Sequence, residues 1–291
     1  MTFLSEITAI QNIIYIFSSI LFITGIKMLG KEDTAVKGNF FSALAMFIAV
    51  SITLIDVVNP IVLLSGIALG ALIGSFIALK VKMTSIPEMV ALFNGFGGLA
   101  TFLIAWSEVN SIPDNLFQHV LVMTTLYIGG VTFTGSLVAY AKLSEKIKIA
   151  KTSIITKIFT TIFYISLPFL LYSTFVTPFI VTSFEFFTVL LVLTLLGGIG
   201  FVLPIGGGDM PVVISLLNSF SGIAAAFAGL LLLNNVLIVA GSLVGASGLI
   251  LTVIMAKAMN RSISNILFVG YASSSASSSS SEEQGEVSPI S

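Results

Sequence analysis

The sequence predicts an all-α integral membrane protein, a bundle of about nine transmembrane helices with its amino terminus outside and its carboxyl terminus in the cytosol. Three observations lead to this fold class. Of the 291 residues, 56% are hydrophobic and 9% are charged, and the mean hydropathy is +1.12, whereas soluble domains carry roughly 25% charged residues. Nine apolar runs are long enough to cross a bilayer, and the basic residues fall in every second connection between them.

Each apolar run holds about 20 mostly apolar residues, the length that crosses roughly 30 Å of hydrocarbon. Charges, prolines or polar clusters separate the runs. The expected helices are 9–29, 40–58, 61–79, 86–106, 116–141, 158–176, 179–203, 210–233 and 236–255. The boundary between the sixth and the seventh, near Thr177 and Pro178, is the least sharply marked. No basic residue precedes Lys27, so the first run does not open like a cleaved signal peptide and we expect it to be retained.

The basic residues predict the orientation. All 12 Lys and Arg residues follow the first, third, fifth or ninth run: Lys27, Lys31, Lys37, Lys80, Lys82, Lys142, Lys146, Lys148, Lys151, Lys157, Lys257 and Arg261. Because connections rich in Lys and Arg stay in the cytosol, these residues place the amino terminus outside. The opposite side holds Glu6, Glu108, Asp114 and His119, and we expect His119 to be a solvated residue at the membrane rim.

The last residues differ from the rest in composition. Residues 272–281 are almost pure serine and residues 282–286 are largely acidic, so this segment cannot bury a core and predicts a flexible linker. We therefore expect residues 1–271 to form the transmembrane domain. Residues 272–291 are expected to be a Ser/Glu-rich linker toward a cytosolic domain that lies outside this sequence.

Several classes of chemistry are excluded by composition. The chain has no cysteine and one histidine, so a Cys-based or multi-His metal centre cannot form. The net charge of −1 and the small, separated basic clusters make nucleic acid an unsuitable partner. Gly95, Gly97 and Ala100 match G-x-G-x-x-A, but they lie inside an apolar run and do not follow a strand, so we interpret the match as spurious.

Two asparagines stand out inside the apolar runs. Asn94 lies about 11 Å beyond Pro87 and Asn218 about 14 Å beyond Asp209 at the helical rise per residue, which places both near the bilayer midplane. Small and polar residues at helical spacing form four stripes: Asn94, Gly98, Thr101, Ala105; Thr125, Gly129, Thr132, Ser136; Ser215, Asn218, Gly222, Ala225, Gly229; and Gly241, Gly245, Gly248, Thr252. Such stripes serve close helix packing. Alternatively, the four faces meet and line a hydrated path that contains the two amides.

Two carboxylates lie where apolar runs begin. Asp209 follows three glycines and precedes Pro211, and Glu88 follows Pro87. Either residue can cap a helix and interact with its dipole, a contribution of roughly 0.3–1 kcal/mol. Alternatively, each places a carboxylate at the cytosolic mouth of the path.

Five sequence strings resemble the beta subunit of proton-translocating NAD(P) transhydrogenases. They are Met-Thr-Ser-Ile-Pro-Glu-Met-Val-Ala-Leu at 83–92, Val-Thr-Phe-Thr-Gly-Ser at 131–136, Gly-Gly-Asp-Met-Pro-Val-Val at 207–213, Leu-Asn-Ser-Phe-Ser-Gly at 217–222 and Ala-Lys-Ala-Met-Asn-Arg at 256–261. The resemblance covers essentially the whole chain, including the nine runs and the acidic linker.

The resemblance implies a membrane enzyme of the cell inner (plasma) membrane that couples hydride transfer between NAD(H) and NADP(H) to proton movement. In that family an alpha subunit carries the NAD(H)-binding domain, an NADP(H)-binding domain follows the membrane helices of the beta subunit, and two alpha–beta units assemble. This chain is then expected to hold the proton path and the coupling elements, with no catalytic residue, no nucleotide site and no metal site of its own.

The resemblance also assigns residues. It places Asn94, Asn218, Ser247 and Gly248 along the proton path, and Asp209, Lys257 and Arg261 in the coupling to the NADP(H)-binding domain. Glu88 is also expected along the path, because its position at the start of an apolar run puts a carboxylate at the cytosolic mouth. Asn94 departs from the pattern, because many members have histidine there and an amide cannot exchange a proton near neutral pH. We expect Asn94 to order water or orient a neighbour, with the titrating histidine on a helix of the alpha subunit.

Two other classes of function fit the residues taken alone. A secondary transporter of a small solute also uses Gly- and Pro-interrupted helices and midplane amides, although the sequence has no evident inverted repeat. A membrane anchor subunit would need only the apolar helices. Without the resemblance, the residues leave three alternatives open: a subunit with a proton path, a secondary transporter and a membrane anchor.

Overall fold

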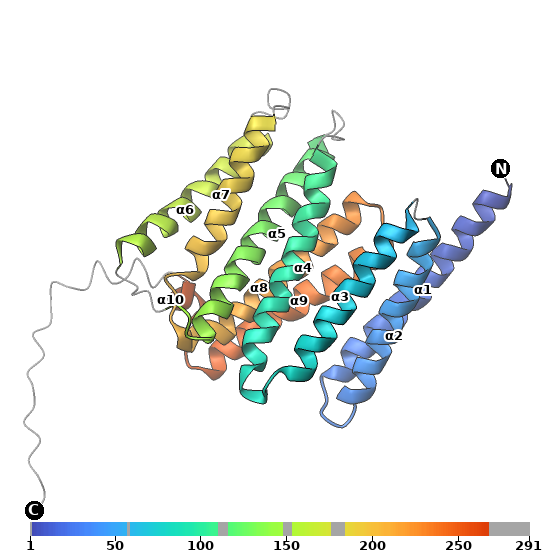
Figure 1. The fold of residues 1–291 in the computed structure, drawn as a ribbon, viewed down its shortest axis with the longest axis horizontal. Helices are drawn as coiled ribbons and strands as arrows, with labels where there is room; N and C mark the ends of the chain where they lie inside the picture. The colour runs from blue at the N-terminus through green and yellow to red at the C-terminus, as the bar shows by residue number, and fades with distance from the viewer. Residues whose placement is uncertain (1, 57–58, 110–115, 148–152, 176–183, 268–291) are drawn as a thin grey trace, which may run out of the picture.

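The computed structural model describes residues 2–56, 59–109, 116–147, 153–175 and 184–267, and every regular element in these ranges is a helix. Figure 1 shows a tilted array of helices that run up and down in alternation. The helices are α1 (Thr2–Leu29), α2 (Ala35–Thr53), α3 (Pro60–Lys80), α4 (Ile86–Glu108), α5 (Leu116–Leu143), α6 (Ile154–Phe175), α7 (Phe184–Val202), α8 (Met210–Leu231), α9 (Asn235–Ala258) and the short α10 (Ile263–Leu267).

The lengths of these helices confirm the membrane fold class. Among the described residues, eight helices are long and apolar enough to cross a bilayer. Within α7, residues Thr188–Val202 form a shorter apolar stretch. The helices α1 to α9 correspond in order to the nine expected runs.

The helix boundaries agree with the sequence where a proline or a polar cluster marks them. The starts at Ile86, Leu116 and Met210 are confirmed. The second helix differs, because it begins at Ala35 and ends at Thr53, whereas the apolar run suggested 40–58. Hydropathy marks only the part of a helix that lies in hydrocarbon, and the helical turn around Lys37 lies outside that part. The boundary at Thr177 and Pro178 lies outside the described residues.

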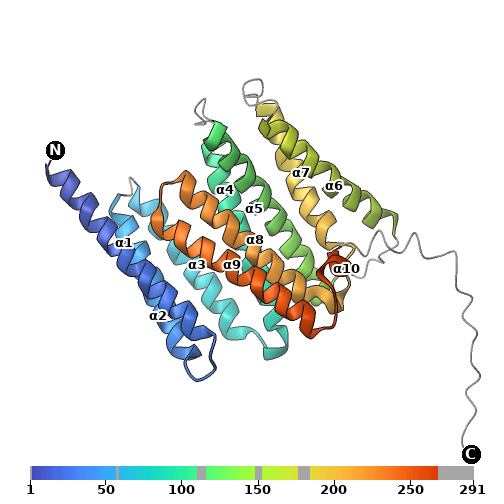
Figure 2. The same ribbon diagram turned by 180° about the vertical axis from the view of Figure 1, so that it is seen from behind.

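Helix α5 forms the centre of the bundle and is buried along most of its length. It contacts α4, α7 and α8, while α6 packs on the far side of α7. Helices α8 and α9 form a tightly packed pair on one face (Figure 2), and α9 connects this core to the α1–α2 pair at the edge. Helix α3 lies on the opposite face and has no buried residue.

The connections α1–α2, α3–α4, α7–α8 and α9–α10 lie along the lower left edge of Figure 1, together with the end of α5 and the start of α6. We call this edge the basic end, because the helix bounds place every described Lys and Arg there: Lys27, Lys31, Lys37, Lys80, Lys82, Lys142, Lys146, Lys157, Lys257 and Arg261. The clustering of positive charge at one end is therefore confirmed for these residues. The assignment of this end to the cytosol stays a prediction, and the expected linker 272–291 lies outside the described residues.

Candidate functional site

Three hydrogen-bonded polar residues, one buried and two half-buried, join three helices of the bundle. The Asn94 Nδ2 amide of α4 donates a hydrogen bond of 2.9 Å to Ser136 Oγ of α5. The Ser221 hydroxyl of α8 donates one of 2.8 Å to Asn94 Oδ1. We call these three residues the Asn94 group. Because hydrocarbon offers no competing hydrogen-bond partner, each of these bonds fixes one helix against another.

Glycine at position 95 allows this approach of α4 to α5. A Cβ atom on Gly95 would lie 3.2 Å from Ser136 Cβ, and one on Gly98 would lie 2.9 Å from the backbone oxygen of Gly129. The sequence stripes on these two helices therefore pack directly against each other. Close packing positions Ser136 within reach of the Asn94 amide, which supports the packing interpretation of these stripes. The hydrated path stays a prediction.

The remaining predicted path residues lie in different surroundings. Asn218 is half-buried on α8, and its backbone carbonyl lies 2.8 Å from the Ser221 hydroxyl oxygen. Gly248 is buried where α9 meets α8, and its carbonyl accepts from Ser215 Oγ at 3.2 Å. Ser247 is exposed and donates to Val244 O on its own helix at 3.1 Å. Ser221 thus meets the Asn94 side chain but only the backbone carbonyl of Asn218, one turn earlier on its own helix. Ser247 does not belong to the Asn94 group, and the roles of Asn218 and Ser247 stay predictions.

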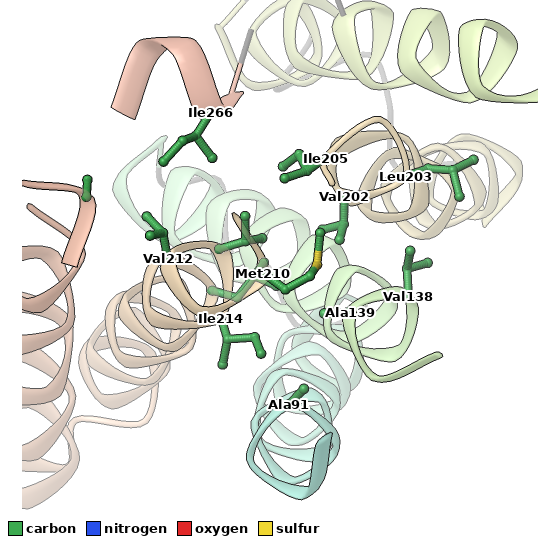
Figure 3. Packing of buried hydrophobic residues seen from close by; sticks show 13 residues of the cluster. Ala91, Val138, Ala139, Val202, Leu203, Ile205, Met210, Val212, Ile214 and Ile266 are labelled. Carbon is green, nitrogen blue, oxygen red and sulfur yellow. The ribbon is translucent and has the colours of Figure 1, made fainter. Parts of the chain in front are cut away.

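An apolar layer separates the Asn94 group from the basic end. Figure 3 shows how side chains from α4, α5, α7, α8 and α10 converge there. The layer consists of Ala91, Val138, Ala139, Val202, Leu203, Ile205, Met210, Val212, Val213, Ile214, Leu217, Ala256 and Ile266, all buried.

The apolar layer and the Asn94 group are adjacent levels of the same helices. On α4, Asn94 lies one turn further from the basic end than Ala91. On α8, Ser221 lies one turn beyond Leu217, and on α5, Ser136 lies one turn beyond Ala139. Tightly packed apolar side chains therefore lie between the Asn94 group and the basic end along these three helices.

Asp209 and Arg261 form an ion pair at the basic end. Arg261 Nη2 lies 3.0 Å from Asp209 Oδ2, and the two side chains are 45% and 11% exposed. Asp209 occupies the N-cap position of α8, as predicted, but its side chain makes no capping hydrogen bond. The carboxylate therefore connects the start of α8 to the segment after α9. An ion pair with one half-exposed partner contributes only about 0–1 kcal/mol to stability. Its main effect is therefore to hold the start of α8 next to the segment after α9.

Two other residues predicted at this end form no ion pair with any part of the chain that the structure describes. Lys257 lies in the last turn of α9 and is exposed. Glu88 lies in the first turn of α4 and is half-buried. Both are placed at the basic end together with Asp209, and their roles in coupling and in the proton path stay predictions.

Lys142 and His119 have surroundings that the sequence did not predict. The Lys142 ammonium, taken from sequence as an orientation signal, donates to the backbone oxygens of Val202 at 3.3 Å, Ile205 at 2.7 Å, and Leu203. It thereby caps the carboxyl end of α7 from α5. His119 is only 5% exposed, so the expectation of a solvated rim residue is wrong. The reason is that α5 is surrounded by other helices even in its first turns, where Leu121, Val122 and Met123 are also buried.

Sequence reasoning singled out Asn94 but not its partners as site residues. Ser136 was visible as the last member of a small-residue stripe, and Ser221 lies one turn beyond Asn218 on the same helix. Either spacing could have suggested a partner. The choice of these two serines among many mid-helix hydroxyls depends on how α4, α5 and α8 are packed.

Comparison with known proteins identifies the family. The model of the NAD(P) transhydrogenase beta subunit family matches residues 11–291. Two curated proteins of Rhodospirillum rubrum named NAD(P) transhydrogenase subunit beta are each 36% identical to this chain over 273 residues. These alignments cover 89% of this chain and 58% of each relative, so the chain spans somewhat more than half the length of the curated relatives it matches. With a match over nearly its whole length, this chain belongs to the NAD(P) transhydrogenase beta subunit family.

Proposed function

We propose that this chain forms the transmembrane proton path of a proton-translocating NAD(P) transhydrogenase. In the whole enzyme, hydride passes between NAD(H) bound to an alpha subunit and NADP(H) bound to a domain that follows linker 272–291. We place the enzyme in the inner membrane as a dimer of alpha–beta units. Membership of the beta subunit family and the long apolar helices support this proposal.

The observation that carries the proposal is the placement of two features on one helix. At the start of α8, Asp209 pairs with Arg261 on the segment that leads toward the expected NADP(H)-binding domain. About 18 Å further along α8, Ser221 hydrogen-bonds to Asn94. A pull on Asp209 or on the segment from Lys257 to Arg261 would therefore be transmitted by a rigid helix to the polar group at the midplane.

The residues of this chain have separable tasks in the proposed mechanism. The apolar layer keeps the Asn94 group closed toward the basic end, and displacement of α8 opens it. Asn94 does not titrate, so it orients the group that carries the proton, which we place on an alpha-subunit helix as a histidine. An alpha subunit without a midplane histidine would contradict this placement. Each proton crossing contributes about 2.3 kcal/mol per 100 mV, enough to bias a nearly balanced hydride exchange.

The test uses the assembled enzyme in sealed vesicles. Reduction of an NAD analogue by NADPH is followed while a pH-sensitive dye reports the vesicle interior. Hydride transfer with a pH change that an uncoupler abolishes is expected, and Asp209→Asn should reduce the protons moved per hydride. Hydride transfer without any pH change would instead make this chain an anchor. Full coupling in Asp209→Asn would contradict the role of the Asp209–Arg261 pair.

A further inference from the structure

We propose that Ser221 is a positioning residue whose hydroxyl alternates between two acceptors and thereby controls the Asn94 carbonyl. Ser221 Oγ lies 2.8 Å from Asn94 Oδ1 and 2.8 Å from the backbone oxygen of Asn218. A serine hydroxyl has one proton to donate. Two acceptors at equal distance therefore compete for that proton, and rotation about a single side-chain bond exchanges them.

The two positions of the hydroxyl differ in what they leave available. When Ser221 donates to Asn94, both ends of the Asn94 amide are engaged, because Nδ2 donates to Ser136. When Ser221 turns to the Asn218 carbonyl, Asn94 Oδ1 loses its donor and can accept a hydrogen bond from water or from a protonated group. Asn94 and Ser221 are half-buried, and at such a position an acceptor that has lost its donor favours a new hydrogen bond.

The two acceptors also respond differently to motion of α8. The Asn218 carbonyl belongs to the same helix as Ser221, so its distance from the hydroxyl stays constant when α8 shifts as a rigid body. Asn94 belongs to α4, so its distance changes with any displacement of α8 relative to α4. A small shift of α8 therefore selects the acceptor. This inference rests on the proposed function, in which the Asp209 end of α8 is moved.

Neighbouring serines of α8 provide a matched control. Ser219 is fully buried and donates at 2.6 Å to the Gly245 carbonyl of α9, not to α4. Ser219→Ala removes a buried interhelical hydrogen bond of the same helix while leaving the contacts of Asn94 in place. An effect of Ser221→Ala that Ser219→Ala does not share is therefore specific to Asn94.

The first test is spectroscopic and does not depend on proton transport. Infrared spectra of the assembled enzyme with ¹³C-labelled asparagine side chains are recorded, and the Asn94 carbonyl bands are assigned by their loss in Asn94→Ala. Two bands are expected for the wild type, and one band at the higher wavenumber for Ser221→Ala. Ser219→Ala should keep both. A single Asn94 band in the wild type would overturn the proposal.

The second test measures coupling in vesicles. Ser221→Ala should lower the protons moved per hydride about tenfold, the order expected when one hydrogen bond no longer orients an essential group. Ser221→Thr, which keeps the hydroxyl, should restore coupling, and Ser219→Ala should leave it unchanged. Equal losses in both alanine variants would assign Ser221 a merely structural role. If Ser221→Ala does not assemble, Ser221→Cys replaces it as a weak donor with the same expectations.

The two tests separate this inference from the proposed function. A wild-type enzyme that transfers hydride without moving protons would contradict the proposed function, while the infrared bands would still decide whether Ser221 has two positions. Two bands combined with full coupling in Ser221→Ala would show that the hydroxyl alternates without controlling transport, which also overturns the inference.

Discussion

Arg261 Nη2 lies 3.0 Å from Asp209 Oδ2, so the residue at which α8 begins is tied to the segment that follows α9. Helices α8 and α9 already pack along their whole length through small residues, with Gly222 against the Gly245 backbone. The ion pair links the start of α8 to the segment after α9 at the basic end, where a following domain would act on these helices. We therefore regard α8 and α9 as one rigid body, and the Asp209–Arg261 pair as the point at which a following domain would move it.

Removing Arg261 should uncouple the enzyme without unfolding the membrane domain. Arg261→Ala leaves the Asp209 carboxylate without this partner and so releases the start of α8 from the segment after α9, at a cost of only about 0–1 kcal/mol in stability. We expect fewer protons per hydride in the vesicle assay and an unchanged yield of folded protein. Lys82→Ala, which removes an exposed charge at the same end, is the control. Equal coupling in both variants would contradict the role of the pair.

A histidine at position 94 should introduce a pH dependence that the amide cannot have. The imidazole pKa is ordinarily about 6.5, so Asn94→His would be charged below this pH and neutral above it. We expect proton-coupled hydride transfer in this variant to depend on pH more steeply than in the wild type, because the imidazole can change its charge and the amide cannot. Asn94→Gln, which keeps an amide, serves as the control. A profile for Asn94→His that parallels the one for Asn94→Gln would exclude position 94 from the path.

Lys142 should stabilise the fold, in addition to any part that its charge has in setting the orientation of the helices. Its ammonium donates to the last carbonyl of α7 and to carbonyls just beyond it, and hydrogen bonds to charged groups contribute roughly 1.5–3 kcal/mol. We expect Lys142→Met to lower the unfolding temperature of the detergent-solubilised protein. Lys146→Met provides the comparison, because Lys146 is exposed and contacts only Tyr140 in the described chain. A larger loss in Lys146→Met than in Lys142→Met would refute the capping role.

The class of fold and the order of helices could be predicted because the bilayer imposes them. Hydrocarbon thickness sets helix length, and the positive residues label alternate connections. Which helices touch could not be predicted, because lipid is as apolar as leucine and hydropathy does not distinguish a buried face from a lipid-facing one. Helix α3 is as apolar as α9, yet α3 buries no residue and α9 buries Gly241, Gly245 and Gly248.

The behaviour of polar side chains in hydrocarbon also explains which residues of the candidate site could be recognised from sequence. The cost of an amide in hydrocarbon made Asn94 recognisable from sequence. Ser247 and Ser221 were equally plausible as mid-helix hydroxyls, because serine can satisfy itself on its own helix, as Ser247 does with the Val244 carbonyl. Only the packing of α8 against α4 decides that Ser221 meets Asn94 and that Ser247 does not.

The α8–α9 pair should tolerate no side chain at Gly222. A Cβ atom there would meet the backbone of Gly245, which cannot move without shifting the whole helix. Overpacking of this kind costs typically about 1–3 kcal/mol, so we expect Gly222→Ala to lower thermal stability clearly. Gly97→Ala is the matched control on α4, because a Cβ atom there has no neighbour within 4 Å. Alanine also favours helix over glycine, so Gly97→Ala should be neutral or slightly stabilising.

The apolar layer should act as a barrier to protons, and Leu217 is the residue that tests it. Leu217 is fully buried in the layer one turn below Ser221, and its truncation to alanine leaves a cavity that costs about 2–5 kcal/mol and loosens the seal. We expect Leu217→Ala to raise the passive proton leak of vesicles that hold the assembled enzyme without nucleotides. Leu249→Ala, at a position 44% exposed on α9, removes the same atoms outside the layer and should leave the leak unchanged. If Leu217→Ala vesicles hold a pH gradient as long as Leu249→Ala vesicles do, the seal toward the basic end lies elsewhere in the bundle.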